Sequence, residues 1–179
     1  MEKIYETAYA KINLGLDVLG KRSDGYHEVR MVMQSVGLSD AVEIEEGEGL
    51  VVETDHSGLA GGPDNLAWKA AELLARCCGK IPNVHIRLNK KIFLAAGLAG
   101  GSSDAAAVMR GLSRLWQLDL TAPELEKLAA ELGSDIPFCI TGGTALAEGR
   151  GEILTELPEA PELLLVLAKP KLEVATAVS

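Results

Sequence analysis

The chain has 179 residues, of which 47% are hydrophobic and 24% charged, so it can bury one apolar core and is neither disordered nor collagen-like. Its 17 basic and 26 acidic residues give a net charge of −9, and the basic residues are scattered, which argues against nucleic acid or an anionic membrane as a partner. A small anionic ligand stays compatible with this charge, because loops and helix ends can bind phosphate locally.

The first half of the chain predicts mostly strands. Alternating apolar and polar residues favour one or two strands within residues 4–19, a turn at 21–27, and further strands at 29–36, 41–46 and 84–88. Before the last of these strands, Asn65 is expected to open an amphipathic helix that runs to about Cys77, and Gly79 can end it.

The second half predicts two helices and two strands. A strong helical pattern covers residues 102–116, and a capping box at Thr121 opens a second helix that runs through Leu132. Strands are expected at 144–147 and 163–168. The sequence therefore predicts one mixed α+β domain.

The cysteines and the chain ends bear on compartment and completeness. Cys77 and Cys78 are adjacent and Cys139 is far away, which is neither a disulfide framework nor a zinc spacing. The N-terminus lacks a secretory signal, and no apolar run approaches the roughly 20 residues that span a bilayer. We therefore expect a reduced, cytoplasmic compartment. Residues 169–179 follow an apolar stretch without a terminal helix or a polar tail, so we expect a truncated chain.

A glycine-rich loop between a predicted strand and a predicted helix is the most informative segment. Residues 94–107 contain three glycines followed by Ser102 and Ser103. Free backbone N–H groups at a helix start attract anions, glycines let the backbone approach a phosphate, and serines add hydroxyl donors. The loop matches neither a Walker A motif nor a dinucleotide-binding fingerprint. The alternative is a tight turn in which a serine only caps the helix.

Four side chains elsewhere could carry chemistry, and each also has an ordinary structural interpretation. Asp135 follows a helix stop and could be a general base or a local cap. Lys11, in the first strand, could be the cationic partner of that base or a solvated lysine. Tyr26 and His27, in a polar loop, could contact a nucleotide base or pack within the loop. Local pattern alone does not bring these residues together.

Four segments, taken in order, resemble the GHMP kinase superfamily. They are Ala10-Lys11-Ile12-Asn13-Leu14, Asp24-Gly-Tyr-His-Glu28, Ala96-Gly-Leu-Ala-Gly-Gly-Ser-Ser-Asp104 and Gly133-Ser-Asp-Ile-Pro137. The resemblance implies an α+β fold similar to the second domain of ribosomal protein S5, with a left-handed βαβ crossover that departs from the usual handedness. It also implies an N-terminal ATP-binding domain at residues 1–168 and the start of a truncated C-terminal substrate domain at 169–179.

The glycine-serine segment alone resembles only the superfamily, whereas the segments 24–28 and 133–137 narrow the resemblance to members of non-mevalonate isoprenoid biosynthesis and imply a phosphoryl transfer in that pathway. ATP, with Mg²⁺, would phosphorylate the 2-hydroxyl of a methylerythritol group linked to CDP. Asp135 would be the general base, and Lys11 would orient it and stabilise the transferring charge. The expected partner is therefore a small molecule with a CDP group, and a homodimer is left open.

The matching positions also assign binding residues. Those expected to hold ATP are Gly97, Leu98, Ala99, Gly100, Gly101, Ser102, Ser103, Asn65 and Lys90. Those expected to hold the acceptor substrate are Asn13, Tyr26, His27 and Thr176. Ser103 is the candidate ligand of Mg²⁺, which accepts hydroxyl, water and phosphate oxygens together. Two residues depart from the family pattern: Phe93 stands where proline is usual, and Ala99 where glycine is commoner.

Three other functions remain open. Another kinase of the superfamily, acting on homoserine, a sugar or mevalonate, would have no use for a cytidine-binding pair at Tyr26 and His27. An RNA-binding module would conflict with the net charge of −9. A serine hydrolase would need Ser102 or Ser103 within Gly-x-Ser-x-Gly, and neither serine has this context. Because family members continue into a second domain, the 179-residue chain alone is expected to be weakly active or inactive.

Overall fold

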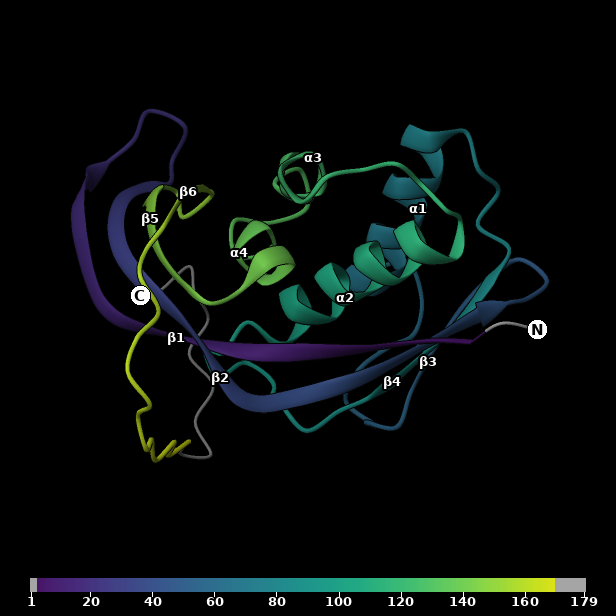
Figure 1. The fold of residues 1–179 in the computed structure, drawn as a ribbon, viewed down its shortest axis with the longest axis horizontal. Helices are drawn as coiled ribbons and strands as arrows, with labels where there is room; N and C mark the ends of the chain where they lie inside the picture. Colours follow the sequence, from purple (N-terminus) through teal and green to yellow (C-terminus); the bar gives the residue numbers. More distant parts are fainter. Residues whose placement is uncertain (1–2, 170–179) are drawn as a thin grey trace.

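The computed structural model describes residues 3–169, which form a six-stranded sheet and four helices (Figure 1). The strands are β1 (Lys3–Lys21), β2 (His27–Glu46), β3 (Leu50–Thr54), β4 (Val84–Asn89), β5 (Thr144–Gly149) and β6 (Ile153–Glu156). The helices are α1 (Leu66–Cys78), α2 (Gly100–Leu115), α3 (Ala122–Ala129) and α4 (Ile136–Thr141). The prediction of a mixed α+β fold is confirmed.

The central element of the sheet is β2, which pairs with three other strands. β1 runs antiparallel to β2 along nearly its whole length. On its other edge, β2 pairs with β5 through residues 29–34 and with β4 through residues 41–46. The sequence predicts two separate strands here, whereas the structure joins them into one. The irregular pattern at residues 35–40 marks the point where β2 exchanges one partner for another.

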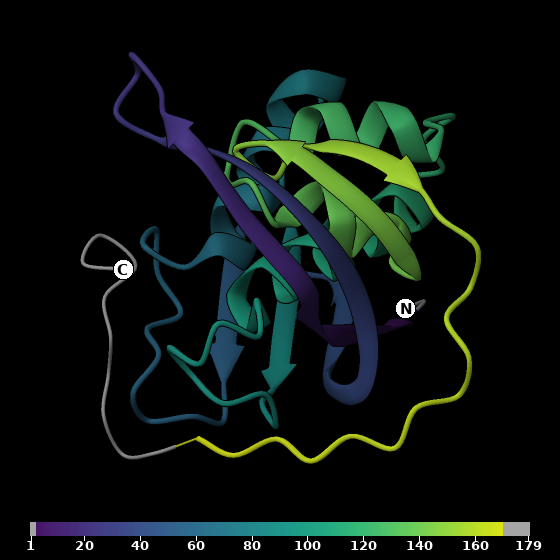
Figure 2. The same cartoon turned by 90° about the vertical axis from the view of Figure 1, so that its left-hand side faces the viewer.

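Helices α1 and α2 cover one face of the sheet (Figures 1 and 2). α1 begins after Asn65, whose side chain accepts a hydrogen bond from the Ala67 N–H, and ends at Gly79 in the left-handed conformation, as the sequence predicts. α2 lies close to the sheet, since a Cβ at Gly111 would come 2.5 Å from Ile44 Cδ1. Within residues 3–169, no helix is long and apolar enough to cross a membrane.

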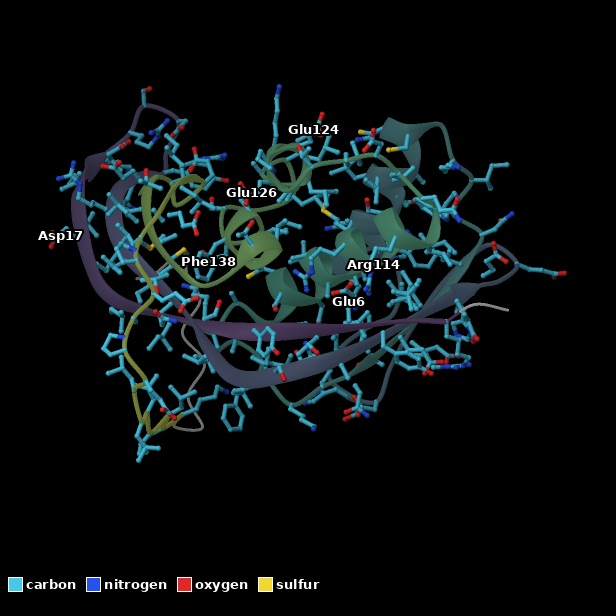
Figure 3. The ribbon with its side chains drawn as sticks, in the orientation of Figure 1. Glu6, Asp17, Arg114, Glu124, Glu126 and Phe138 are labelled. Carbon is cyan, nitrogen blue, oxygen red and sulfur yellow. The ribbon has the colours of Figure 1, made fainter. Side chains whose placement is uncertain are left out.

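Two arginines of α2 connect this helix to β1 (Figure 3). Glu6 of β1 accepts a hydrogen bond of 3.1 Å from Arg110 Nε and lies 2.5 Å from Arg114 Nη2. The Arg110 guanidinium also donates to the backbone carbonyls of Thr7 in β1 and Cys139 in α4. Because the Arg110 side chain contacts both β1 and α4, α2 is held at a defined position relative to these two elements.

Several elements differ from the prediction. β3, β6 and α4 have 5, 4 and 6 residues, which is too short for a clear period, and sequence analysis misses them. α3 starts after the predicted capping box at Thr121 but ends at Ala129, because the following residues form turns. The strand predicted at 163–168 is wrong: in the described part of the chain this segment is in no strand, and Leu164 and Val166 are 102% and 92% exposed. An apolar pattern alone does not supply the partner that a strand requires.

Candidate functional site

The glycine loop leads directly into the first turn of α2. Ala95, Gly97 and Ala99 have positive φ angles of 49°, 69° and 57°. Alternating left-handed residues can bend a backbone into a concave turn with its amides on one side. The first helical hydrogen bond joins the Ser103 N–H to the Ala99 carbonyl at 2.8 Å, so the three preceding amides have no acceptor within the helix. The loop therefore presents uncapped donors at the positive end of the helix dipole.

Two hydrogen bonds join the start of α2 and its loop to β1. The Lys11 N–H donates to the Leu98 carbonyl at 3.1 Å, and Ser103 Oγ donates to the Tyr9 carbonyl at 2.7 Å. Leu98 and Ser103 are both buried at this contact. The glycine loop is thereby fixed beside the part of β1 that carries Lys11.

Lys11, Asn13 and Asp135 lie next to one another. The Lys11 ammonium is 3.8 Å from Asp135 Oδ2 and donates a hydrogen bond of 3.0 Å to Asn13 Oδ1. The Lys11 side chain is 6% exposed and that of Asp135 is 35% exposed. Asp135 stands at the N-cap of α4, but its side chain makes no capping hydrogen bond. Its carboxylate therefore faces a buried cation while remaining open to solvent.

Cys139, one turn further along α4, has a neutral thiol. Burial raises the pKa of Cys139 to about 12, and the negative charge of Asp135 adds to the shift. The thiolate is the form that acts as nucleophile or metal ligand, and a thiol with this raised pKa stays protonated at neutral pH. The groups of this site that can act on a substrate are consequently the ammonium of Lys11 and the carboxylate of Asp135.

Two residues expected to bind the nucleotide are engaged within the protein. Asn65 caps α1 and donates from Nδ2 to the Ala60 carbonyl at 2.8 Å. The Lys90 side chain is 1% exposed, and its ammonium pairs with Asp40 and Asp104. The Lys90 ammonium is therefore not directed at a phosphate in this structure, and a contact of Lys90 with a nucleotide would fall to its main chain.

Tyr26 and His27 lie at the turn end of the β1–β2 hairpin. Tyr26 is 55% exposed, and the Arg150 guanidinium lies 5.0 Å from its ring centroid, within cation–π distance. Asp24 Oδ1 accepts a hydrogen bond of 3.1 Å from the Tyr26 N–H, which orders the turn. An aromatic surface and an exposed imidazole are thus available at this end of the sheet. Thr176 lies outside the described residues.

Three charged residues beside Lys90 or Tyr26 are not predicted from the sequence as part of a site: Asp40, Asp104 and Arg150. Arg150 sits in a glycine-rich stretch that indicates only a hairpin turn, and this turn indeed joins β5 to β6. Asp104 follows the two serines of the loop and looks like an ordinary helix residue. Asp40 gives a faint signal, because it is the one acid within the otherwise uncharged stretch from residue 31 to residue 42.

Comparison with known proteins first gives a match to one family model. Residues 65–143 match the model of the GHMP kinases N terminal domain. This match includes the glycine loop, helix α2 and Asp135 at the start of α4. The resemblance found in the sequence is therefore confirmed over the part of the chain that builds the loop.

Several curated relatives share one name, 4-diphosphocytidyl-2-C-methyl-D-erythritol kinase. The protein of this name from Caldanaerobacter subterraneus subsp. tengcongensis is 50% identical over 174 residues, covering 97% of this chain and 60% of the relative. The one from Synechococcus sp. (strain JA-3-3Ab) is 54% identical over 172 residues, covering 95% and 56%. A crystal structure of 4-(cytidine 5'-diphospho)-2C-methyl-D-erythritol kinase has a TM-score of 0.73 and 38% identity over 86% of this chain and 55% of that chain. This chain spans about 60% of the length of these curated relatives.

Proposed function

We propose that this chain is the ATP-binding part of a kinase that phosphorylates the 2-hydroxyl of 4-(cytidine 5'-diphospho)-2-C-methyl-D-erythritol. The observation that carries this proposal is the Lys11–Asp135 pair, 3.8 Å apart, beside the uncapped amides that open α2. Phosphoryl transfer demands mainly in-line positioning, neutralisation of phosphate oxygens and a group that receives the acceptor proton. Donors for the phosphates and a carboxylate for the proton are both present here.

Each residue of the pair has a distinct task in the proposed reaction. Asp135 accepts the proton of the attacking hydroxyl, because its carboxylate is partly open to solvent. Lys11, almost fully buried, holds that carboxylate in place and stabilises the negative charge of the transferring group. Asn13, already bonded to the Lys11 ammonium, orients the substrate beside it. The free amides of residues 97–102 bind the triphosphate.

Mg²⁺ would lie between the ATP phosphates and this loop, where it would neutralise phosphate charge. Ser103 Oγ keeps lone pairs free, but it already donates to the Tyr9 carbonyl and its residue is 1% exposed. Within residues 3–169, no group of three His, Cys, Asp or Glu side chains is placed to hold a metal. We therefore propose that phosphate and water oxygens supply most of the Mg²⁺ ligands, as is common for this ion.

The acceptor is proposed to bind toward the hairpin end of the sheet. Tyr26, His27 and Thr176 would contact its cytidine diphosphate group, and Arg150 beside the Tyr26 ring adds a positive charge there. The same proposal includes a domain division at residue 168. It also includes similarity to the second domain of ribosomal protein S5, with a left-handed β3–α1–β4 crossover. The parallel pairing of β3 and β4 on either side of α1 is consistent with such a crossover. Three free cysteines support a cytoplasmic location, and a homodimer stays a prediction.

The test is a kinase assay on the full-length protein with the CDP-linked acceptor and ATP. Wild type is expected to phosphorylate the acceptor, and Lys11→Met and Asp135→Asn are each expected to lower kcat by about 10²–10⁴-fold. Lys3→Met is the matched control, because Lys3 lies in the same strand, is itself exposed and pairs with two half-buried glutamates. Activity of both site variants within twofold of wild type would overturn the proposed mechanism. The chain of 179 residues alone is expected to turn over far more slowly.

A Tyr26→Ala variant distinguishes the cytidyl acceptor from other acceptors. We expect its KM for the CDP-linked acceptor to rise at least tenfold while its KM for ATP stays unchanged, because the loop proposed to bind ATP contacts β1 at Tyr9 and Lys11, away from the turn that carries Tyr26. Homoserine, mevalonate and galactose serve as comparison acceptors. Faster phosphorylation of one of these by wild type would replace the CDP-linked acceptor with that compound.

A further inference from the structure

A buried cluster of three charged side chains lies beneath the glycine loop. The Lys90 ammonium lies 2.5 Å from Asp40 Oδ2 and also contacts Asp104 Oδ2. The three side chains, here called the Asp40–Lys90–Asp104 cluster, are each no more than 1% exposed. Asp40 belongs to β2, Lys90 directly follows β4, and Asp104 lies in the second turn of α2. The cluster thus joins three separate elements through one ammonium group.

Asp40 also holds the backbone that leads to the loop. Its Oδ1 accepts hydrogen bonds from the N–H groups of Lys91 and Ile92, the latter at 2.8 Å. Ile92 in turn touches the first residue of α2, since a Cβ at Gly100 would lie 3.0 Å from Ile92 Cγ2 and 3.7 Å from Lys90 Nζ. The segment before the loop and the helix after it are therefore fixed against the same carboxylate–ammonium group.

Such a cluster is not the simplest way to stabilise a core. Charges buried away from water lose their hydration, and well-packed apolar side chains of similar size often give equal or greater stability. Here two carboxylates surround one ammonium, and Asp104 Oδ1 has no hydrogen-bond partner within the described chain. Directional bonds, unlike apolar contacts, set the separation and orientation of the groups they join. The cluster therefore serves mainly to fix the relative positions of Asp40 in β2, Lys90 after β4 and Asp104 in α2.

We propose that the Asp40–Lys90–Asp104 cluster positions the glycine loop for the nucleotide, by locking the segment 90–92 and the first turns of α2 into one rigid unit. The cluster residues act through the backbone they hold and do not themselves touch the phosphates. This inference rests on the proposed function, because the loop is taken to bind the phosphates of ATP. It assigns to Lys90 a positioning role in place of the direct contact expected from the sequence.

The first test uses Asp40→Asn in the full-length protein, with Glu43→Gln as the matched control. Glu43 lies three residues further along β2 and pairs with Lys3 and Arg87 at the surface. We expect Asp40→Asn to raise the Kd of Mg–ADP at least tenfold in calorimetry and to leave the KM of the acceptor within twofold. Hydrogen exchange of the peptide that covers residues 90–93 should become at least tenfold faster. Glu43→Gln should change neither quantity.

A second variant covers the case in which Asp40→Asn does not fold. Asp40→Asn combined with Lys90→Met and Asp104→Leu removes all three buried charges and leaves an amide oxygen at position 40 to accept from the N–H groups of Lys91 and Ile92. Such replacements are often neutral or stabilising, so this variant should fold. We expect its thermal midpoint to stay close to that of wild type while its Kd for Mg–ADP rises at least fivefold.

The outcomes separate this inference from the proposed function. If wild type binds Mg–ADP and each variant that folds binds it equally well, the positioning role is wrong and the kinase proposal is unaffected. If affinity falls only in proportion to lost thermal stability, the cluster is merely structural and the inference is again overturned. If wild type binds no Mg–ADP, the proposed function is wrong, and so is this inference, because it rests on that function. Weaker binding at unchanged stability supports the positioning role.

Discussion

Replacing Asp104 by asparagine should change how the stability of the protein depends on pH. Burial raises the pKa of Asp104 to about 7 from its ordinary value of 3.8, and this effect outweighs the opposing attraction of Lys90, while the nearby Asp40 raises the pKa further. Between these two values the folded protein binds more protons at residue 104 than the unfolded chain does. The free energy of unfolding therefore falls as the pH rises through this range.

The size of this effect follows from the shift. Each unit of pKa difference corresponds to about 1.4 kcal/mol, so the free energy of unfolding of wild type should fall by about 3 kcal/mol between pH 5 and pH 8 because of Asp104 alone. Asparagine does not titrate, so Asp104→Asn should lack this contribution. Burial of the charged Asp104 carboxylate lowers the stability of wild type most at high pH. The free energy of unfolding of Asp104→Asn should therefore rise relative to that of wild type as the pH rises.

Urea unfolding of both proteins at pH 5, 6, 7 and 8 measures the difference directly. Glu43→Gln is the control: its side chain is 25% exposed, and the hydrogen bond from Lys3 lowers the pKa of its carboxyl, so it titrates below this pH range. The quantity of interest is the change with pH in the stability of Asp104→Asn relative to wild type. If that relative stability stays constant from pH 5 to pH 8, Asp104 is not a buried carboxyl with a raised pKa.

Two further predictions concern stability. Gly61→Ala should lower the free energy of unfolding by about 2–3 kcal/mol, because its Cβ would lie 1.9 Å from the backbone carbonyl oxygen of Val52. Gly62→Ala is the control and should change this free energy by less than about 1 kcal/mol, because the space around its Cβ is open. Equal losses of stability in denaturant unfolding would contradict this prediction. Arg110→Met should lower the free energy of unfolding by about 2–3 kcal/mol, because it leaves a carboxylate and backbone carbonyls without their donor. Arg30→Met is the control and should lower it by less than about 1 kcal/mol, because it removes an exposed ion pair. Similar thermal midpoints for both variants would show that the Arg110 contacts add little stability.

Much of the fold can be predicted from local pattern, and the exceptions have physical reasons. Asn65 and Gly79 mark the ends of α1 because a capping side chain and a left-handed residue are needed there and few residue types supply them. α4 carries no such signal: Ile136, Pro137, Phe138 and Ile140 are all buried, so the helix has no polar face to produce a period. Strand partners leave no local trace either, which is why β2 is predicted in two pieces.

Parts of the candidate site can likewise be predicted from local sequence, and other parts cannot. The glycine loop and its helix can be predicted from composition and spacing, because an anion-binding helix start needs small residues and free amides. The proximity of Lys11 and Asp135 is suggested only by the resemblance to a kinase family, since nothing near either residue encodes a contact between the first strand and α4. The partners of Lys90 could not be predicted at all, because burial of its ammonium depends on how β2 and α2 meet.

The uninterrupted course of β2 has a consequence for substrate length. One strand begins at His27, beside the proposed cytidine contact, and reaches Asp40, beneath the proposed phosphate-binding loop. Its hydrogen-bonded neighbours fix its length, so β2 sets the distance between the proposed cytidine contact and the proposed phosphate-binding loop. A single inserted residue would lengthen β2 by about 3.3 Å and turn the side chains beyond it to the opposite face. Under the proposed function, the number of residues in β2 therefore sets the separation between the cytidine group of the acceptor and the phosphates of ATP.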